Sequence, residues 1–426
     1  MAKKGKKGKK GKKGKKGEKG PEVRTTMAMI AGREKMLCPR MGDNYTRVMK
    51  VGEIMDDVCT QTLRKCGSKN ETSVILCGMK LSMLPDFFSI APSLRLLQDV
   101  NLARNDLFNG AQVFSVLSQL KKLKRLNLSN NCLNGKLHDS MCDLTELEVL
   151  HLDYNQLTQF PARTHLWTKL HTLTFSDNAV RELPAEASFW KCLVYINMRS
   201  NRLTELPGDV VRSWPLIERL SASFNKLKSI PDSISFCNKL TELDLCNNLI
   251  DHVPEELAMC RELQVLNLAS NKIEDVPVDV FQSLSQLKDL QLYKNKISAL
   301  PPELGNLRSL ARLSLSSNNL KALPEEIGAC VNLKELYINN NAKFSVIPGT
   351  AGHLRQLQEL SARKCPALKQ LPNTLCDMES LRELDVRAAK KQVCKIAPDL
   401  NDSLKAQHCI VRGGVVKKAK GGKGKK

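Results

Sequence analysis

The sequence predicts an α/β solenoid, a curved stack of similar coils with a parallel sheet on the concave side and short helical or 3₁₀ segments on the convex side. Two observations lead to this prediction. The pattern LxxLxLxxNxL, in which x is any residue, returns every 23 to 26 residues through most of the 426-residue chain. A leucine, isoleucine or valine directly before a proline follows most copies of the pattern. Aromatic residues make up only 4% of the chain, so we expect a core built mainly from leucine and isoleucine.

Both ends of the chain are rich in lysine and glycine. Residues 1–24 contain KKGKKGKKGKKGKKG, a run with no apolar residue to bury, and residues 412–426 end in KKAKGGKGKK. We expect both segments to be disordered tails. Residues 1–20 contribute +10 and residues 412–426 contribute +7 to a net charge of +22, so the rest of the chain carries only +5.

The tails should attract polyanions such as RNA, DNA, acidic lipid surfaces or the acidic tails of tubulin. They contain no aromatic residue, so base stacking and sequence readout are not supported. A purely solubilising tail and a nuclear-import signal remain open as alternatives. The lysines that would make the polyanion contacts are Lys3, Lys4, Lys6, Lys7, Lys9, Lys10, Lys12, Lys13, Lys15, Lys16, Lys417, Lys418, Lys420, Lys423, Lys425 and Lys426.

Residues 25–73 form an N-terminal segment in which we expect a capping helix over residues 43–66. Asp43 is a candidate N-cap and Gly67 a candidate stop. The apolar residues that recur near a 3.6-residue period are Val48, Val51, Met55, Val58 and Leu63.

Residues 74–398 form the repeat domain, with about 14 coils. In each coil the LxL part predicts a short strand with inward leucines, followed by a sharp turn. The asparagine of the pattern has two donors and an acceptor, so it can satisfy backbone groups at that turn, within one coil and between coils. The eleven asparagines are Asn105, Asn131, Asn155, Asn178, Asn201, Asn225, Asn248, Asn271, Asn295, Asn318 and Asn341.

The ends of the repeat domain depart from the pattern. Met79, Cys365 and Ala389 stand where the asparagine would be. Terminal coils have only one neighbour, so atypical sequences are expected there. Residues 399–411 are interpreted as a C-terminal cap. In the interior, the pairs from Leu183-Pro184 to Leu371-Pro372 predict extended backbone that leads into a short helical turn, because proline fixes φ and lacks a donor.

The stretch LPEEIGACVNLKELYINNN, residues 323–341, resembles the repeat of an intracellular leucine-rich repeat group. That group includes Scribble, Erbin, the Ras suppressor proteins and the plant Ras-group repeat proteins, and the resemblance covers roughly residues 74–398. It implies a curved horseshoe that binds proteins, with small GTPases, phosphatase subunits and cell-cortex or cytoskeletal proteins as recurring ligands. It does not specify the partner.

Side chains alternate along a strand, so the residues before, between and after each LxL pair should face the concave side in three lanes. Fourteen strands give an inner arc of roughly 60 Å, enough for one or two standard protein interfaces. Tyrosine and arginine are favoured interface anchors. The candidate contact residues are Tyr195, Arg199, Tyr293, Arg312, Glu335, Tyr337, Glu359, Arg363, Glu383 and Arg387.

Glu335, Glu359 and Glu383 should stack in one lane, where like charges on adjacent strands repel. Either Arg363 and Arg387 pair with them locally, or a basic ligand uses them. A plain solvated polar face is the alternative to a partner site.

Catalysis, a cofactor and a metal site are not expected. The seven histidines show no ligand spacing, and His151 beside Asp153 lacks a placed nucleophile. Fifteen cysteines occur without a CxxC pair, as is typical of free thiols in a reducing compartment, and Cys237, Cys260 and Cys330 are interpreted as core filler.

We therefore expect a non-catalytic intracellular adaptor in signal transduction. The alternative is a structural component of a cytoskeletal, axonemal or ribonucleoprotein assembly that is anchored by its tails. No run of 18 apolar residues occurs, so a transmembrane segment is not expected, and the predicted location is cytoplasmic, with cytoskeletal or nuclear association as alternatives.

Overall fold

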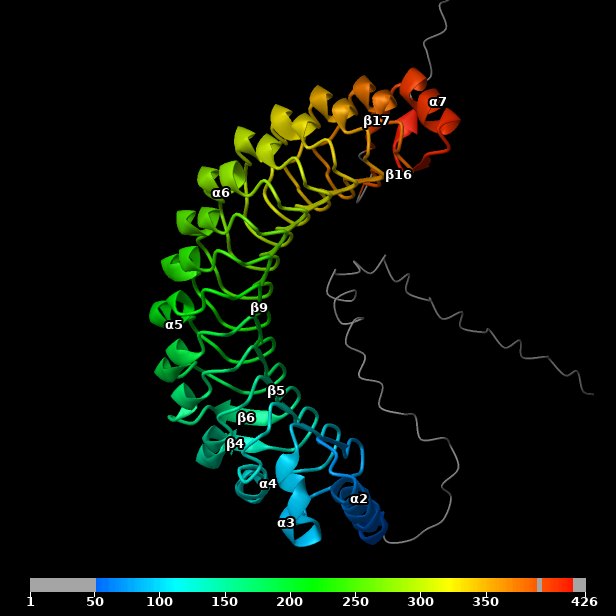
Figure 1. The fold of residues 1–426 in the computed structure, drawn as a ribbon. Helices are drawn as coiled ribbons and strands as arrows, with labels where there is room; N and C mark the ends of the chain where they lie inside the picture. The colour runs from blue at the N-terminus through cyan, green and yellow to red at the C-terminus, as the bar shows by residue number, and fades with distance from the viewer. Residues whose placement is uncertain (1–50, 389–392, 417–426) are drawn as a thin grey trace, which may run out of the picture. The chain divides into compact units, whose positions relative to one another are not determined.

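The structure, a computed structural model, describes residues 51–388 and 393–416, and all of its elements belong to one compact unit, Met49–Lys426. Within that unit the coils stack side by side, with short helical segments such as α5 and α6 on the outer side and strands such as β9 on the inner side (Figure 1). The solenoid predicted from the repeat pattern is therefore confirmed.

The concave sheet has fifteen parallel strands that follow one another in chain order, apart from four strands that pair outside it. The sheet strands are β1 (Ser73–Ile75), β2 (Asp99–Asn101), β3 (Arg125–Asn127), β5 (Val149–His151), β7 (Thr172–Thr174), β8 (Tyr195–Asn197), β9 (Arg219–Ser221), β10 (Glu242–Asp244), β11 (Val265–Asn267), β12 (Asp289–Gln291), β13 (Arg312–Ser314), β14 (Glu335–Tyr337), β15 (Glu359–Ser361), β16 (Glu383–Asp385) and β18 (Ile410–Arg412). The separate pairs are β4 (Asn134–Lys136) with β6 (Gln156–Gln159), and β17 (Lys395–Ile396) with β19 (Val415–Val416).

Short helical segments line the convex side, apart from the 18-residue helix at the start of the stack. The α-helices of the described chain are α2 (Val51–Ser68), α3 (Phe87–Ile90), α4 (Gly110–Leu117), α5 (Gly208–Arg212), α6 (Val278–Ser283) and α7 (Pro398–Ala406). The 3₁₀ segments are η1 (Pro92–Leu96), η2 (Asp139–Asp143), η3 (Thr164–Leu166), η4 (Ala185–Phe189), η5 (Asp232–Phe236), η6 (Glu255–Met259), η7 (Pro302–Asn306), η8 (Glu325–Ala329), η9 (Gly349–His353) and η10 (Asn373–Asp377). None of the helices in the described residues is both long and apolar enough to cross a membrane.

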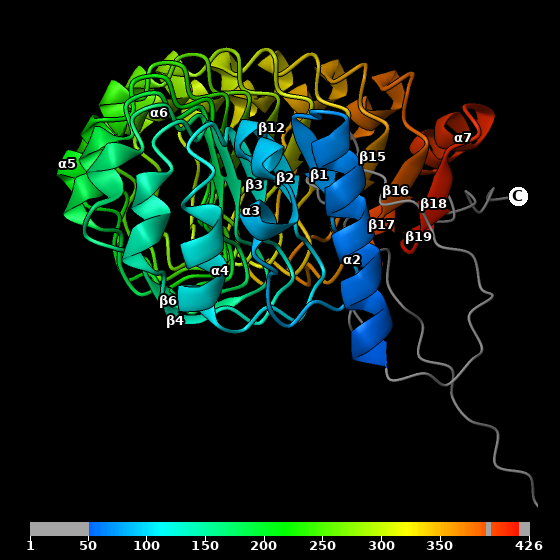
Figure 2. The same cartoon turned by 60° about the horizontal axis from the view of Figure 1, so that its bottom comes forward.

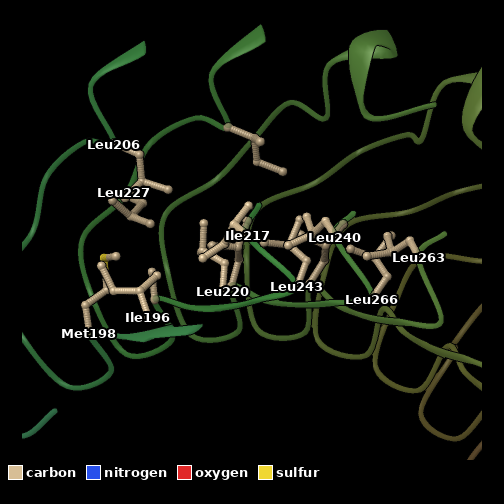
Figure 3. Close-up of a cluster of buried hydrophobic side chains, with 14 of the residues drawn as sticks. Ile196, Met198, Leu206, Ile217, Leu220, Leu227, Leu240, Leu243, Leu263 and Leu266 are labelled. Carbon is tan, nitrogen blue, oxygen red and sulfur yellow. The ribbon is translucent and has the colours of Figure 1, made fainter. Parts of the chain in front are cut away.

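Leucines at equivalent positions of successive coils fill the interior. Leu220, Leu243 and Leu266 pair in register on β9, β10 and β11, and each is at most 1% exposed. Figure 3 shows these side chains in a row, together with Leu240 and Leu263 from the first position of their coils. Because every coil supplies the same apolar atoms to its neighbours, the core is continuous along the stack.

The pattern asparagines form a spine between coils, as predicted. Asn271 donates from Nδ2 to the carbonyl of Leu268 in its own coil and to that of Leu245 in the preceding coil, both at 3.0 Å. Its Oδ1 accepts the backbone N–H of Ile250 at 3.0 Å. All eleven asparagines make this set of bonds, and we call them the asparagine spine.

The residue directly before each spine asparagine has a positive φ, between 53° and 62°. This is the left-handed region, which costs a non-glycine residue energy unless the surrounding structure holds it there. The repeat pattern did not predict this feature, since none of these residues is glycine. The spine bonds on either side of the turn supply the required restraint.

A column of tryptophans and cysteines follows the convex segments. The indoles of Trp190 and Trp214 donate to the carbonyls of Thr164 and Ala187 in the preceding coils, at 3.0 and 3.1 Å. Further along the stack the same position holds cysteines that are fully buried: Cys237, Cys260 and Cys330. Burial raises the pKa of each of these three thiols to about 12, which confirms the interpretation as core filler.

The first coil is covered by α2, which packs against β1 and η1 (Figure 2). The predicted helix start at Asp43 lies outside the described residues, and the helix runs on to Ser68. The prediction that Gly67 stops the helix is wrong. A Cβ at Gly67 would come within 2.4 Å of the Ala91 Cβ, so glycine is needed there for close packing, and the chain reverses at Asn70, where φ is 53°.

The last coil extends further than predicted. α7 begins at Pro398, and the chain then returns as β18, which pairs with β16 through Ile410 and Arg412. β19 follows and pairs with β17. The prediction of a disordered tail from residue 412 is therefore wrong for residues 412–416. The segment CIVRGGVV has no leucine template, so the repeat pattern could not reveal this strand.

Candidate functional site

The concave face presents three lanes of side chains, because alternate residues of each short strand point away from the core. The register of the sheet aligns equivalent residues: Glu335 lies beside Glu359, and Glu359 beside Glu383. The alignment of these three glutamates was predicted from the period of the repeat. We call them the acidic lane.

Tyr337 bridges two members of the acidic lane. Its hydroxyl lies 2.6 Å from Oε2 of Glu359 and 3.2 Å from Oε2 of Glu335. One hydroxyl proton can be donated to only one of the two carboxylates at a time. Burial raises the pKa of Glu335, although nearby Arg312 opposes the rise. Burial and the two carboxylates together raise the pKa of the Tyr337 hydroxyl.

Arginines do not neutralise this pair. Among the described residues, no ion pair within 4.0 Å includes Glu335 or Glu359, whereas Glu383 contacts Arg412 at 2.8 Å. Of the two alternatives, local pairing of Arg363 and Arg387 with the glutamates is not found among the ion pairs of the described residues. Both arginines instead contact Asp385.

Asp385 is the acceptor for both arginines: it lies in the middle lane of β16, and its side chain is only 6% exposed. Arg387 reaches it at 2.7 Å and Arg363 at 3.6 Å. Its carboxylate also accepts the backbone N–H of Arg387 at 3.2 Å. A buried carboxylate is stabilised by such partners, so Asp385 captures the cations ahead of the more exposed glutamates.

Arg312 and Tyr293 occupy neighbouring coils of the face. Arg312 contacts Asp289 at 2.8 Å, and the Asp289 side chain is 1% exposed. Gln291 donates to the same carboxylate at 2.6 Å. Tyr293 is half-buried, and burial raises the pKa of its hydroxyl, with Cys246 and Asp244 adding to the rise.

Two arginine–aromatic stacks lie at the middle of the face. The guanidinium of Arg199 lies 4.4 Å from the Phe224 ring centroid, and that of Arg219 lies 4.4 Å from the Tyr195 ring centroid. Tyr195 and Arg199 were predicted contact residues, but their partners were missed. The signal was present in the lane positions, where Arg219 stands directly across from Tyr195 in the register of β8 and β9.

Burial raises the pKa of two carboxyl groups beside these stacks. Asp244 accepts the backbone N–H of Cys246 at 3.2 Å and is 6% exposed. Burial raises the pKa of its carboxyl, and the hydrogen bonds and Arg199 only partly oppose this. Burial likewise raises the pKa of Glu242, against the effect of Arg219.

His151 belongs to a hydrogen-bonded network with Thr174 and Asp153. The Thr174 hydroxyl donates to Asp153, so it accepts from Nδ1 of His151, 2.8 Å away. Ser176 donates to the same carboxylate through its hydroxyl at 2.6 Å and its backbone N–H at 2.8 Å. The Ser129 hydroxyl of the preceding coil also donates to Asp153, at 3.3 Å, so the network ties three coils together. In the described residues there is no cluster of three histidine, cysteine or acidic side chains that could hold a metal.

A hollow of about 180 Å³ lies at the margin of the face opposite the acidic lane, at the turns that follow β14 and β15. We call it the basic hollow, and its lining residues are Asn339, Asn340, Arg363 and Lys364. Arg363 was predicted as a contact residue, but the hollow was not. The predicted lysine contacts of the tails lie outside the described residues.

Comparison with known proteins identifies the repeat. A family model described as "Leucine-rich repeat region" matches residues 256–412. Two further leucine-rich repeat models match residues 191–250 and 215–273, and residues 122–144. Together the matched segments cover more than half of the chain. No curated protein sequence matches it.

Solved structures share the fold. A leucine-rich repeat protein of Leptospira interrogans is 29% identical over 78% of this chain and 81% of its own, with a TM-score of 0.69. The ectodomain of the Arabidopsis thaliana receptor kinase GASSHO1/SCHENGEN3, in complex with CASPARIAN STRIP INTEGRITY FACTOR 2, is 24% identical over 80% and 49%, with a TM-score of 0.54. The Drosophila Toll–Spatzle complex is 22% identical over 79% and 46%, with a TM-score of 0.65. The chain spans about half the length of the last two, whose likeness shows the fold alone.

Proposed function

Because the chain is a leucine-rich repeat protein, we propose that it is a non-catalytic adaptor that binds another protein on its concave face, with β14 to β16 at the centre of the contact. The observation that carries the proposal is the pair Glu335 and Glu359. One tyrosine hydroxyl contacts both carboxylates, and neither forms an ion pair with a described residue. A cation brought by a partner would relieve the repulsion between these carboxylates.

Interface anchors surround this pair. Tyr337 is half-buried and held in place by its two hydrogen bonds, so binding would cost it little rotamer entropy. Arg363 and Arg387 are both held by Asp385, and Arg363, whose contact is the longer one at 3.6 Å, presents N–H groups of its guanidinium fork to a partner. Aromatic and arginine side chains that are pre-organised in this way are the usual centres of binding energy.

The proposed partner class comes from the resemblance of the repeat. The repeat resembles the short-repeat group of Scribble, Erbin and the Ras suppressors, so small GTPases, phosphatase subunits and cytoskeletal proteins are the proposed classes, in a cytoplasmic signalling role. The lysine-rich tails support an additional electrostatic attachment to polyanions. The same tails favour the second candidate function, a structural component of a cytoskeletal, axonemal or ribonucleoprotein assembly.

A pull-down tests the placement of the binding surface. We expect Tyr337→Ala and Glu359→Lys each to reduce recovery of the partner by at least about tenfold, since truncating a hot-spot residue costs 2 kcal/mol or more. Glu326→Lys is the matched control, because it makes the same charge change on the exposed convex segment η8. Unchanged recovery with both face variants would refute the placement.

Tail deletion separates the two candidate functions. An adaptor should extract in mild salt together with a soluble partner, with or without its tails. An assembly component should stay in the insoluble fraction until salt is raised, and should be released by removal of the tails, because screening weakens their electrostatic attachment.

A further inference from the structure

We propose that the basic hollow binds a phosphorylated serine or threonine side chain of the partner, while a lysine or arginine of the same partner segment lies against Glu335 and Glu359. This proposal deepens the proposed function and rests on it, because it assigns a chemical class of ligand to the same part of the concave face. It is carried by the donors of the hollow, by their charge and by their distance from the acidic lane.

The hydrogen-bond donors that line the hollow are held in place and suit an anionic ligand. Oδ1 of Asn339 accepts the backbone N–H of Arg363 and the hydroxyl of Ser361, both at 2.7 Å. One end of this amide is thereby held, and its Nδ2 group, which has no protein acceptor among the described residues, is left for a ligand. The Lys364 ammonium likewise takes part in no ion pair of the described chain.

The guanidinium of Arg363 completes the set. It lies 3.6 Å from Asp385, which is a long contact because Arg387 already occupies that carboxylate at 2.7 Å. Arg363 therefore keeps N–H groups for a second acceptor. A planar fork, a point cation and an amide donor around one hollow suit the three oxygens of a phosphate better than the two of a carboxylate.

The charge of this margin fits a dianion. Arg363 and Lys364 line the hollow and contribute two positive charges, while Asp385 is paired with Arg387 at 2.7 Å, outside the lining. A phosphate monoester carries about −1.5 to −2 at neutral pH, so it matches these two charges, whereas one carboxylate would neutralise only half of them.

The acidic lane places a second requirement on the same ligand. Glu359 and Arg363 are four residues apart along a short strand and the turn that follows it, and so are Glu335 and Asn339. At the rise of an extended strand, four residues span at most about 13 Å, which bounds the distance between the carboxylates and the hollow. An extended partner segment with a basic residue and a phosphorylated residue four positions apart would place the basic residue at the acidic lane and the phosphate in the basic hollow. An acidic partner segment without a phosphorylated residue would bind more weakly, because Glu335 and Glu359 repel it.

The experiment uses short fluorescein-labelled peptides and fluorescence anisotropy with the full chain. One probe carries lysine and phosphoserine about four positions apart, in both orders, since the direction of the segment is free. The second carries serine in place of phosphoserine, and the third carries alanine in place of lysine. We expect the phosphorylated probe to bind at least about tenfold more tightly than the serine probe, and the loss of lysine to weaken binding by a smaller factor.

Variants assign the binding to the hollow. The double variant Arg363→Gln/Lys364→Gln should lose at least about tenfold in affinity for the phosphorylated probe. Lys294→Gln is the matched control, because Lys294 occupies the same exposed turn position three coils earlier, at a φ of 55° against 54° for Lys364. The lysine-rich tails contribute equally to all three proteins, so the comparison cancels their attraction for the probe. Arg387 still pairs with Asp385 in the double variant, which protects its fold.

Two results would overturn the proposal: equal binding of the phosphorylated and serine probes, or equal loss in the double variant and the Lys294→Gln control. Either could occur while the pull-down with Tyr337→Ala and Glu359→Lys still shows loss of the partner. In that case the concave face binds a protein, and the assignment of its ligand to a phosphorylated segment is wrong. If the phosphopeptide results are as expected and the pull-down shows no loss, the hollow binds the phosphorylated segment and the placement of the protein-binding surface on Tyr337 and Glu359 is wrong.

Discussion

The asparagine spine and the concave face lie within a few residues of each other in every coil, yet they follow opposite rules. In the coil of β14, Asn341 repeats the bonds that ten other asparagines make, while the Tyr337 hydroxyl contacts two carboxylates, those of Glu335 and Glu359. The spine asparagines hydrogen-bond to backbone groups, which are the same in every coil. The side chains of the face hydrogen-bond to and form ion pairs with one another, and they differ from coil to coil.

This difference separates what holds the solenoid together from what it can recognise. The amide groups of the spine asparagines are not available to a partner, because their donors and acceptors are used within and between neighbouring coils. The contacts on the face join exposed or half-buried side chains, such as Arg363 with Asp385, and a partner can replace or extend them. Stability and recognition should therefore respond to different substitutions.

The largest expected effect is the loss of a spine residue. Asn318 is 6% exposed, accepts the N–H of Ile297 at 3.0 Å and donates to the carbonyls of Leu292 and Leu315 at 2.9 and 3.0 Å. Asn318→Ala leaves these three groups unsatisfied, at about 1 to 3 kcal/mol each, so we expect the free energy of unfolding to fall by roughly 3 kcal/mol or more. Urea denaturation followed by circular dichroism measures the loss.

The neighbouring residue provides the control. Asn319 is exposed, and its side chain makes one hydrogen bond, to the carbonyl of Lys296 at 3.2 Å. Asn319→Ala should change the free energy of unfolding by about 1 kcal/mol or less. If the two variants lost similar stability, the spine would have no special structural role. Hydrogen exchange at the Ile297 amide adds a local readout, since that amide should exchange faster only in Asn318→Ala.

A smaller effect is expected from a charge buried in the face. Because burial raises the pKa of Asp244, the folded state favours the neutral carboxyl. The stability that this preference contributes is fully present below the ordinary aspartate pKa of about 3.9 and is lost as pH rises through the raised value. Asp244→Asn should therefore be more stable relative to wild type at pH 8 than at pH 4.

Denaturation of both proteins across that pH range tests the sign. Asparagine can still accept the N–H of Cys246, so the packing of the site is kept. A stability difference that moves in the opposite direction as pH rises would mean that the ionised carboxylate is stabilised by Arg199 more strongly than burial opposes it. Asp244 would then belong with the structural residues of the molecule and not with its variable face.

Periodicity made the fold and the lanes predictable, because both follow from the spacing of one repeated pattern. The leucine core, the bonding of the spine asparagines and the register of Glu335, Glu359 and Glu383 depend only on position in that pattern. The β18 strand was missed because its sequence lacks the pattern.

Side-chain pairing was not predictable in the same way. Arg363 and Arg387 stood beside both the glutamates and Asp385 in the sequence, and the choice between them depends on burial and rotamers. The basic hollow also escaped prediction. Its residues come from turns that follow two different strands, and only folding brings them together.

The smallest effect on stability is expected at Tyr337. Tyr337→Phe removes a hydroxyl that shares one proton between two carboxylates, and Glu359 is exposed to water that can replace the bond. We expect a change in the free energy of unfolding of less than about 1 kcal/mol, because most of the ring burial is kept. Recovery of the partner should fall, since the two carboxylates are no longer held together for one cation. A stability loss as large as that of Asn318→Ala would show that the face also holds the coils together, and the separation between spine and face would no longer stand.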